Sequence, residues 1–163
     1  MDGAQPDNRR DSTVAGYPLK FLVFLDFDGV LNSKVSSIRF EDPRIFGLEN
    51  VTALNHFLAQ TGARIVVSST WRIGLSIEDL QEILDRSRIW GEVVGKTPRL
   101  WKKRGFEIQQ WLDENPEWQD ASFVILDDDS DMEHLLPRLV KVNNEVGLTV
   151  ENAEEAIKML REP

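Results

Sequence analysis

Three short apolar runs that end abruptly in polar residues constrain the fold of this chain more than any other feature of its sequence. They are residues 21–25, 63–67 and 123–126, followed directly by Asp26, Ser68 and Asp127. Continuous apolar runs of this length are typical of strands buried on both faces of a parallel sheet. We therefore expect an α/β fold with a doubly wound, mostly parallel sheet and helices on both faces.

The segments between these strands carry apolar residues at helical spacing. We expect a helix from about residue 51 to Gly62, a second from Ser76 to about Ser87, a third around 108–112 that stops before Pro116, and a closing helix around 153–160. Short strands are predicted at 93–94 and 139–142. Residues 32–47 are predicted to form a loop or flap.

The length of 163 residues suits one domain, which we place at residues 17–163. Residues 1–16 are polar and contain almost nothing to bury, so we expect a disordered leader there. No stretch approaches the roughly 18 apolar residues of a membrane span. The leader lacks the apolar centre of a signal peptide, and a cytoplasmic location with no membrane association is expected.

The chain is acidic, with a net charge of −9 from 28 acidic and 19 basic residues. Sequence-independent binding of nucleic acid depends on Lys and Arg, so this balance does not favour nucleic acid as a partner, although a local basic patch stays open. The chain has no cysteine, which excludes disulfides, thiol nucleophiles and thiolate metal sites. Any metal must be held by oxygen or imidazole ligands.

The three polar clusters are expected to lie together, since ligands of such sheets bind beyond the carboxyl ends of the strands. Asp26 and Asp28 are two residues apart, so in extended backbone both face one side, about 6.6 Å from each other. Gly29 permits a sharp turn after them. One carboxylate can attack phosphorus while the other acts as general acid and base. Two acidic residues at this spacing more often belong to a solvated loop. Here they follow a buried strand directly, and this position favours a catalytic role.

The second cluster, Ser68, Ser69 and Thr70, offers hydroxyl and backbone N–H groups for phosphate oxygens. A turn or a helix cap would use the same residues. Arg72 could pair either with a phosphate or with one of the many carboxylates.

The third cluster places four carboxylates, Asp127, Asp128, Asp129 and Asp131, directly after a buried strand. Their mutual repulsion would be offset by a divalent cation, and Mg²⁺ is the one that prefers such ligands. A dense cationic patch at residues 102–104 precedes this cluster. This patch has two possible roles. It could be the solvent-exposed start of a helix, or it could supply the fixed positive charge that lets an aspartate nucleophile approach a phosphate dianion.

Four features of the sequence, taken in order, resemble the four motifs of the haloacid dehalogenase (HAD) superfamily, over roughly residues 21 to 160. They are DFDGVL, an apolar run that ends in serine, a Lys or Arg, and an apolar run that ends in DDDSD. The resemblance implies Asp26 as nucleophile and metal ligand, Asp28 as general acid/base with its backbone carbonyl on Mg²⁺, and Ser68 as the phosphate-binding hydroxyl. Arg104 is favoured over Lys103 as the cationic residue. Asp128 would bind the metal, supported by Asp127 and Asp131 directly or through water. The groups expected to contact substrate are Gly29, Ser69, Thr70, Arg72 and Lys103.

The gaps between the motifs are too short for a large cap domain, which leaves the predicted site open. In this superfamily an open site tends to accompany macromolecular substrates or a partner that completes the site, although the fold itself names no substrate. Trp71, Arg72 and Trp101 near the rim could stack a base and pair a phosphate. The alternative is that the tryptophans belong to the core, as the five tryptophans of a small α/β domain more often do, and the net negative charge does not favour a nucleic acid. A phosphorylated substrate is expected, and no protein partner can be inferred.

The predicted function is therefore a Mg²⁺-dependent phosphomonoesterase that forms an aspartyl-phosphate on Asp26, acting on a nucleotide, a nucleic-acid end or another phosphorylated molecule. The alternative is a non-catalytic regulatory domain that binds phosphate or metal. The intact pair of Asp26 and Asp28 argues against that alternative, because a domain without turnover has no chemical need for both. Transfer of the phosphoryl group to an acceptor other than water is a third hypothesis.

Overall fold

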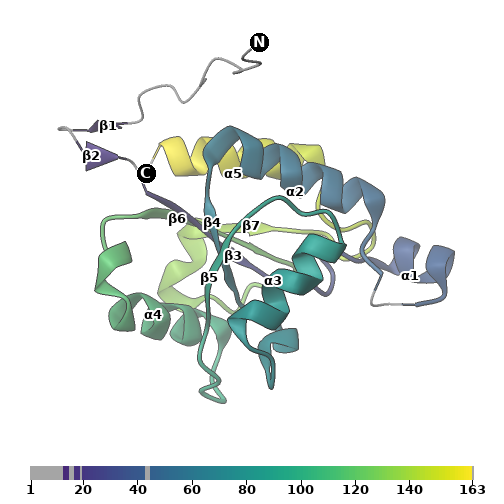
Figure 1. The fold of residues 1–163 in the computed structure, drawn as a ribbon, viewed down its shortest axis with the longest axis horizontal. Coiled ribbons are helices and arrows are strands. Elements are labelled where there is room, and N and C mark those ends of the chain that lie inside the picture. The colour runs from purple at the N-terminus through teal and green to yellow at the C-terminus, as the bar shows by residue number, and fades with distance from the viewer. Residues whose placement is uncertain (1–12, 15–16, 19, 43–44, 163) are drawn as a thin grey trace, which may run out of the picture.

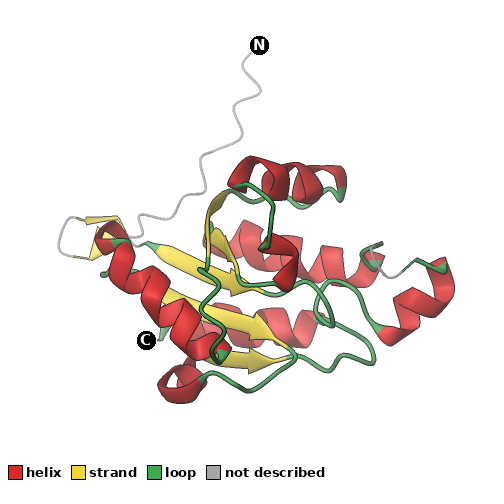
Figure 2. Cartoon of the chain, turned by 90° about the horizontal axis from the view of Figure 1, so that it is seen from below, coloured by secondary structure: helices red, strands yellow, loops and turns green. Residues whose placement is uncertain are grey.

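The computed structural model describes residues 13–14, 17–18, 20–42 and 45–162. Its centre is a five-stranded sheet in which every neighbouring pair is parallel, in the order β5-β4-β3-β6-β7. The strands are β3 (Phe21–Leu25), β4 (Arg64–Val67), β5 (Val93–Lys96), β6 (Ser122–Asp127) and β7 (Leu139–Lys141). Figure 2 shows them running in one direction, with helices on both sides. The predicted α/β class with a doubly wound parallel sheet is confirmed.

Four long helices cover the sheet: α2 (Leu48–Thr61), α3 (Ile77–Arg86), α4 (Arg104–Glu114) and α5 (Val150–Arg161). In Figure 1, α2 and α5 lie side by side over one face, and α4 lies against the other. Alternate residues of β3 supply the two cores, because successive side chains of a strand point to opposite faces. Val23 and Leu25 pack with Phe57 of α2, whereas Phe24 packs with Trp111 of α4.

Helix boundaries follow the capping residues that the sequence offers. The Ser76 side chain accepts from the backbone N–H of Asp79, and the Asp79 carboxylate accepts from that of Ser76, which starts α3. Gly62, at φ 64°, ends α2 in the left-handed conformation that glycine adopts most easily. Both boundaries agree with the predictions.

The predicted flap contains a helix that the sequence did not indicate, α1 (Lys34–Phe40). Ser33 and Ser36 form its N-terminal capping box. Val35 and Ile38 of this helix are exposed, at 49% and 80%. With seven residues, α1 is too short for an apolar pattern of helical spacing to repeat, which explains why a loop was predicted.

Strand order reverses at β3, which places the ends of two motif strands next to each other. The chain moves from β3 to β4 and β5 on one side and returns to β6 on the other. Leu25 of β3 pairs with Leu126 of β6, and the backbone N–H of Asp26 donates to the carbonyl of Leu126 at 3.1 Å. This switch point is where ligands bind in such sheets.

No separate cap domain interrupts the described part of the chain. The connection from β3 to β4 holds α1 and α2, and the connection from β4 to β5 holds a short 3₁₀ helix, η1 (Thr70–Arg72), and α3. In the described residues, the short helix α1 lies in the connection that leaves β3 at this rim.

The N-terminal region is only partly described. Strands β1 (Thr13–Val14) and β2 (Tyr17–Pro18) form an antiparallel pair, and the rest of the predicted leader, residues 1–12 and 15–16, lies outside the described residues. None of the helices in the described ranges combines the length and the apolar character that crossing a bilayer requires.

Candidate active site

Three carboxylates meet where β3 and β6 end. Oxygens of Asp26, Asp127 and Asp128 all lie within 4.8 Å of one another. Asp26 is 4% exposed and Asp127 is fully buried, because Asp26 directly follows β3 and Asp127 is the last residue of β6, both inner strands of the sheet. Among the residues that the structure describes, this is the only group of three or more acidic or imidazole side chains close enough to share a metal ion.

The crowding changes the protonation of the cluster. Burial and the charges of Asp127 and Asp128 raise the pKa of Asp26 to about 8, although the Arg104 guanidinium and the N–H of Phe27 act to lower it. Burial likewise raises the pKa of Asp127 to about 6, against the lowering effect of Arg104. A divalent cation would favour the ionised forms of both groups. The cluster therefore suits a hard divalent metal held by carboxylate oxygens.

Arg104 is the cation that enters this cluster. Its Nη1 lies 3.1 Å from Oδ2 of Asp26 and also donates to Oδ2 of Asp127. Burial lowers the pKa of Arg104, but the carboxylates of Asp127 and Asp26 outweigh it and raise that pKa above its usual value. Lys103 points elsewhere: it is exposed and pairs with Glu133 at 2.9 Å. Arg104, and not Lys103, is thus in contact with the predicted nucleophile.

A glycine allows Arg104 to approach so closely. A Cβ on Gly105 would lie 2.1 Å from the carbonyl oxygen of Met132, so only glycine lets the start of α4 press against the loop after β6. The N–H of Arg104 donates to Oδ2 of Asp131 at 3.2 Å, and that of Gly105 donates to the Asp131 carbonyl. Asp131 therefore contacts the start of α4 and is not part of the three-carboxylate group.

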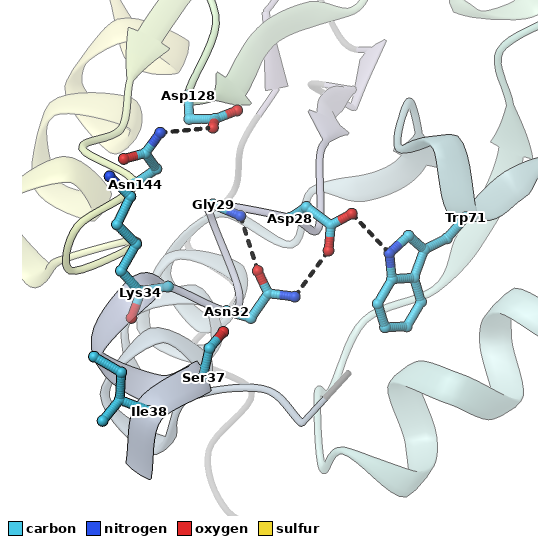
Figure 3. Close-up of a pocket in the computed structure, with 10 residues that line it drawn as sticks. Asp28, Gly29, Asn32, Lys34, Ser37, Ile38, Trp71, Asp128 and Asn144 are labelled. Carbon is cyan, nitrogen blue, oxygen red and sulfur yellow. Dashed lines mark hydrogen bonds between the residues drawn. The ribbon is translucent and has the colours of Figure 1, made fainter. Parts of the chain in front are cut away.

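Asp28 is held from both sides, as Figure 3 shows. The indole N–H of Trp71 donates to its Oδ2 at 3.0 Å, and the amide of Asn32 donates to its Oδ1 at 2.9 Å. Trp71 is fixed in turn by edge-on contacts with Phe27 and a tilted contact with Phe46. The carboxylate of Asp28 is exposed, whereas that of Asp26 is buried, so the two groups have different environments.

Gly29 makes the sharp turn that the sequence suggested. Its φ is 82°, and a Cβ there would come within 2.4 Å of Oδ2 of Asp128. Glycine is required on both counts, because the left-handed backbone disfavours other residues and a side chain would displace a carboxylate of the cluster.

Ser68 presents a buried hydroxyl without a hydrogen-bond partner among the described residues. The residue is fully buried at the end of β4. Thr97 Oγ1, after β5, and Asp131 Oδ1 are buried without partners as well. Buried polar atoms are normally paired, so such atoms at one rim of the sheet indicate a ligand or ordered water there.

In the rest of the second cluster, Ser69 takes the role of a helix cap, the alternative that the sequence left open. The Ser69 hydroxyl accepts from the N–H of Trp71 and caps η1, and Thr70 is exposed. Arg72 is 4% exposed and its guanidinium bonds to the carbonyls of Ser68, Ser69, Thr97 and Pro98 and to the Glu107 carboxylate. These bonds occupy its five N–H groups. Arg72 thus pairs with a carboxylate, one of the two partners that the sequence left open, and all its N–H groups are used within the fold.

A pocket of about 900 Å³ opens beside Asp28. Its walls come from the turn after β3, from α1, from Trp71 and from the loop after β7. The residues that line it include Asn32, Lys34, Ser37, Ile38, Asp128 and Asn144. Asn144 donates to Oδ2 of Asp128 at 3.4 Å. Sequence reasoning missed Asn32 and Asn144. Polar residues follow the predicted strand at 139–142 just as they follow the other three strands. This pattern could have indicated Asn144.

The fold and the site define the chain as a hydrolase of the HAD superfamily. A family model described as the HAD domain in Swiss Army Knife RNA repair proteins matches residues 22–153, and the chain belongs to this family. The matched segment spans every site residue predicted from the sequence. The comparisons with curated proteins and with solved structures found no match.

Proposed function

We propose that this protein is a Mg²⁺-dependent phosphomonoesterase that removes a terminal phosphate from a nucleic-acid end by way of an aspartyl-phosphate on Asp26. The observation that carries the proposal is the group of Asp26, Asp127 and Asp128 within 4.8 Å, beside the unpartnered hydroxyl of Ser68 and the guanidinium of Arg104. Carboxylates, a cation and a hydroxyl that meet at the ends of β3, β4 and β6 can hold a phosphate and a metal together.

The residues divide the work of a two-step displacement. A carboxylate oxygen of Asp26 attacks phosphorus, the bond from phosphorus to the leaving oxygen breaks, and protonated Asp28 gives its proton to that oxygen. Asp28, now ionised, takes a proton from water, whose oxygen attacks phosphorus and releases Asp26 and inorganic phosphate. Trp71 and Asn32 keep Asp28 oriented throughout, since each contacts one of its oxygens.

The charges needed for this chemistry come from Arg104 and from the metal. Arg104 offsets the negative charge that Asp26 and the phosphate bring together. Mg²⁺, held by oxygens of Asp26, Asp127 and Asp128, would neutralise the phosphate and favour the ionised form of Asp26. The Ser68 hydroxyl would donate to a phosphate oxygen.

The open rim supports a large substrate. Because Asp28 faces the pocket of about 900 Å³, the leaving group that it protonates would lie there, between Trp71 and Ile38. Such a pocket has room for a nucleoside. The family description names RNA repair proteins, which favours a phosphorylated RNA end over a small metabolite.

The test is Mg²⁺-dependent phosphate release from a panel of mononucleotides and 3′- and 5′-phosphorylated RNA oligonucleotides. Asp26→Asn keeps the side-chain size but removes the nucleophile, so we expect a loss of about a thousandfold or more in kcat. Mass spectrometry of the wild type, quenched in acid during turnover, should find one added phosphoryl group on the peptide with Asp26. An Asp26→Asn protein as active as wild type would exclude the mechanism.

A further inference from the structure

The loop between β5 and α4 combines an exposed tryptophan with a cluster of cations. Residues 99–104 contain Arg99, Lys102, Lys103 and Arg104 and no acidic residue, in a chain with a net charge of −9. Trp101 is 79% exposed, the highest exposure of any described tryptophan. Figure 1 shows the loop projecting beyond the end of the sheet. Lys103 and Arg104 are paired with carboxylates, so the positive charge of the loop comes from Arg99 and Lys102, which form no ion pair with a described residue.

Both ends of this loop are fixed, although its middle is exposed. The buried guanidinium of Arg72 bonds to the carbonyl of Pro98 at 3.2 Å and pairs with Glu107. The Glu107 carboxylate also accepts from the N–H of Leu100 at 2.8 Å. A buried ion pair therefore holds the loop in shape, which reduces the entropy that a ligand must remove on binding.

The loop leads directly into the candidate active site. Arg104, the first residue of α4, directly follows the loop and contacts Asp26, and Trp101 is three residues earlier. The Cα atoms of Trp101 and Arg104 are thus at most about 11 Å apart. A strand that extends from the phosphate site along the start of α4 would reach the loop.

Trp101 itself is set up as an exposed aromatic platform. Its backbone has a φ of 57°, which is uncommon for a bulky residue. Residues in such uncommon backbone conformations occur often at functional sites. The guanidinium of Arg99 stacks on its ring, 3.5 Å from the centroid. Lys102 is exposed and forms no ion pair with any residue in the described ranges. Stacked aromatic and cationic groups of this kind bind bases and phosphates of single strands.

We propose that residues 99–102 bind the single-stranded RNA next to the phosphorylated end, with a base on Trp101 and backbone phosphates at Arg99 and Lys102. The proposal rests on the function proposed above and assigns the strand-binding surface. It also reconciles an acidic chain with an RNA substrate, because the positive charge is concentrated where the strand would lie.

The test measures binding of a short fluorescein-labelled RNA with a terminal phosphate, by fluorescence anisotropy, with every variant in the Asp26→Asn background to prevent turnover. Trp101→Ala should weaken binding about tenfold or more, since stacking on one aromatic side chain accounts for such a factor. Lys102→Ala should lower the slope of log affinity against log salt by about 0.7, the effect of one lost phosphate contact on a single strand.

Trp90→Ala is the matched control, because Trp90 is also an exposed tryptophan, at 69%, but precedes β5 at the opposite end of the strand. It should leave RNA binding unchanged. Equal affinities for the Trp101→Ala and Trp90→Ala proteins would overturn the proposal. In that case phosphate release from mononucleotides by the protein with Asp26 intact still reports separately on the proposed activity, so the two failures are distinguishable.

Discussion

Asp28 illustrates at the scale of single residues how this fold separates two chemically identical groups. Asp26 is buried among carboxylates and contacts Arg104, whereas Asp28 is exposed and receives neutral donors from Trp71 and Asn32. The two environments suit different tasks, one a nucleophile beside a cation and the other an oriented acid at the pocket. The sequence placed both on one rim, but the donors of Asp28 come from positions that no motif marks.

Replacing Trp71 with phenylalanine tests whether the indole N–H orients Asp28. The ring contacts with Phe27 and Phe46 would remain, so only the donation to Oδ2 of Asp28 is lost. We compare kcat/KM, which reports the first step, because the second step is the same for every substrate. We expect kcat/KM for RNA ends, whose leaving oxygen needs a proton, to fall about tenfold, and kcat/KM for p-nitrophenyl phosphate, whose leaving group needs none, to fall much less.

Trp118→Phe is the control for this substitution, because Trp118 packs near Lys20, away from the cluster. An equal loss on both substrates for Trp71→Phe would point to a general packing role for Trp71 instead. The comparison of leaving groups therefore separates orientation of Asp28 from simple support of the fold.

At the scale of elements, strands and caps were predictable because their determinants are local. Apolar runs gave β3, β4 and β6, and Ser76 and Gly62 marked helix ends. The polar clusters were expected on one rim because parallel strands end together, and Asp26, Ser68 and Asp127 do lie there.

What was not predictable depends on contacts between distant segments. Helix α1 is short and largely exposed, so its capping box alone would have had to indicate it. From the sequence alone, Arg72 could pair with a phosphate or with a carboxylate. In the structure its partner is the carboxylate of Glu107, from α4. Hydrogen bonds between segments 25 to 35 positions apart leave no pattern in a single sequence.

The start of α4 carries the clearest prediction at this scale. Breaking a buried pair leaves uncompensated charges, so Arg104→Gln should lower the free energy of unfolding of the metal-free protein by about 3 kcal/mol. Lys103→Gln, one residue earlier, removes only a solvent-exposed pair with Glu133, so the free energy of unfolding should stay close to that of the wild type. Urea denaturation followed by tryptophan fluorescence measures both.

The same pair of variants should differ in activity on p-nitrophenyl phosphate, because only Arg104 contacts the predicted nucleophile. Arg104→Gln should lower kcat/KM strongly, and Lys103→Gln should leave it near the wild-type value. If Lys103→Gln caused the larger loss, the cationic residue of the site would have been assigned to the wrong position.

At the scale of the whole molecule, stability, protons and metal are linked through the carboxylate cluster. The pKa of Asp26 is about 8 and that of Asp127 about 6 in the folded protein, against an ordinary value of 3.8. The folded state therefore holds protons that the unfolded chain has released between about pH 4 and pH 8. Stability must fall as pH rises through this range, by up to about 1.4 kcal/mol per pH unit for each such group.

The resulting prediction concerns the protein in chelator, unfolded with urea at pH 5 to 9. Wild type should lose stability between pH 6 and 8, and Asp26→Asn, which has no proton to lose there, should lose much less. Mg²⁺ should stabilise wild type more at pH 8 than at pH 6, because metal and proton compete for the same oxygens, and should stabilise Asp26→Asn less at either pH. If stability did not depend on pH and Mg²⁺ had the same effect at both pH values, Asp26 would already be ionised without metal. Arg104 would then be sufficient to balance the cluster, and the metal would act on the phosphate alone.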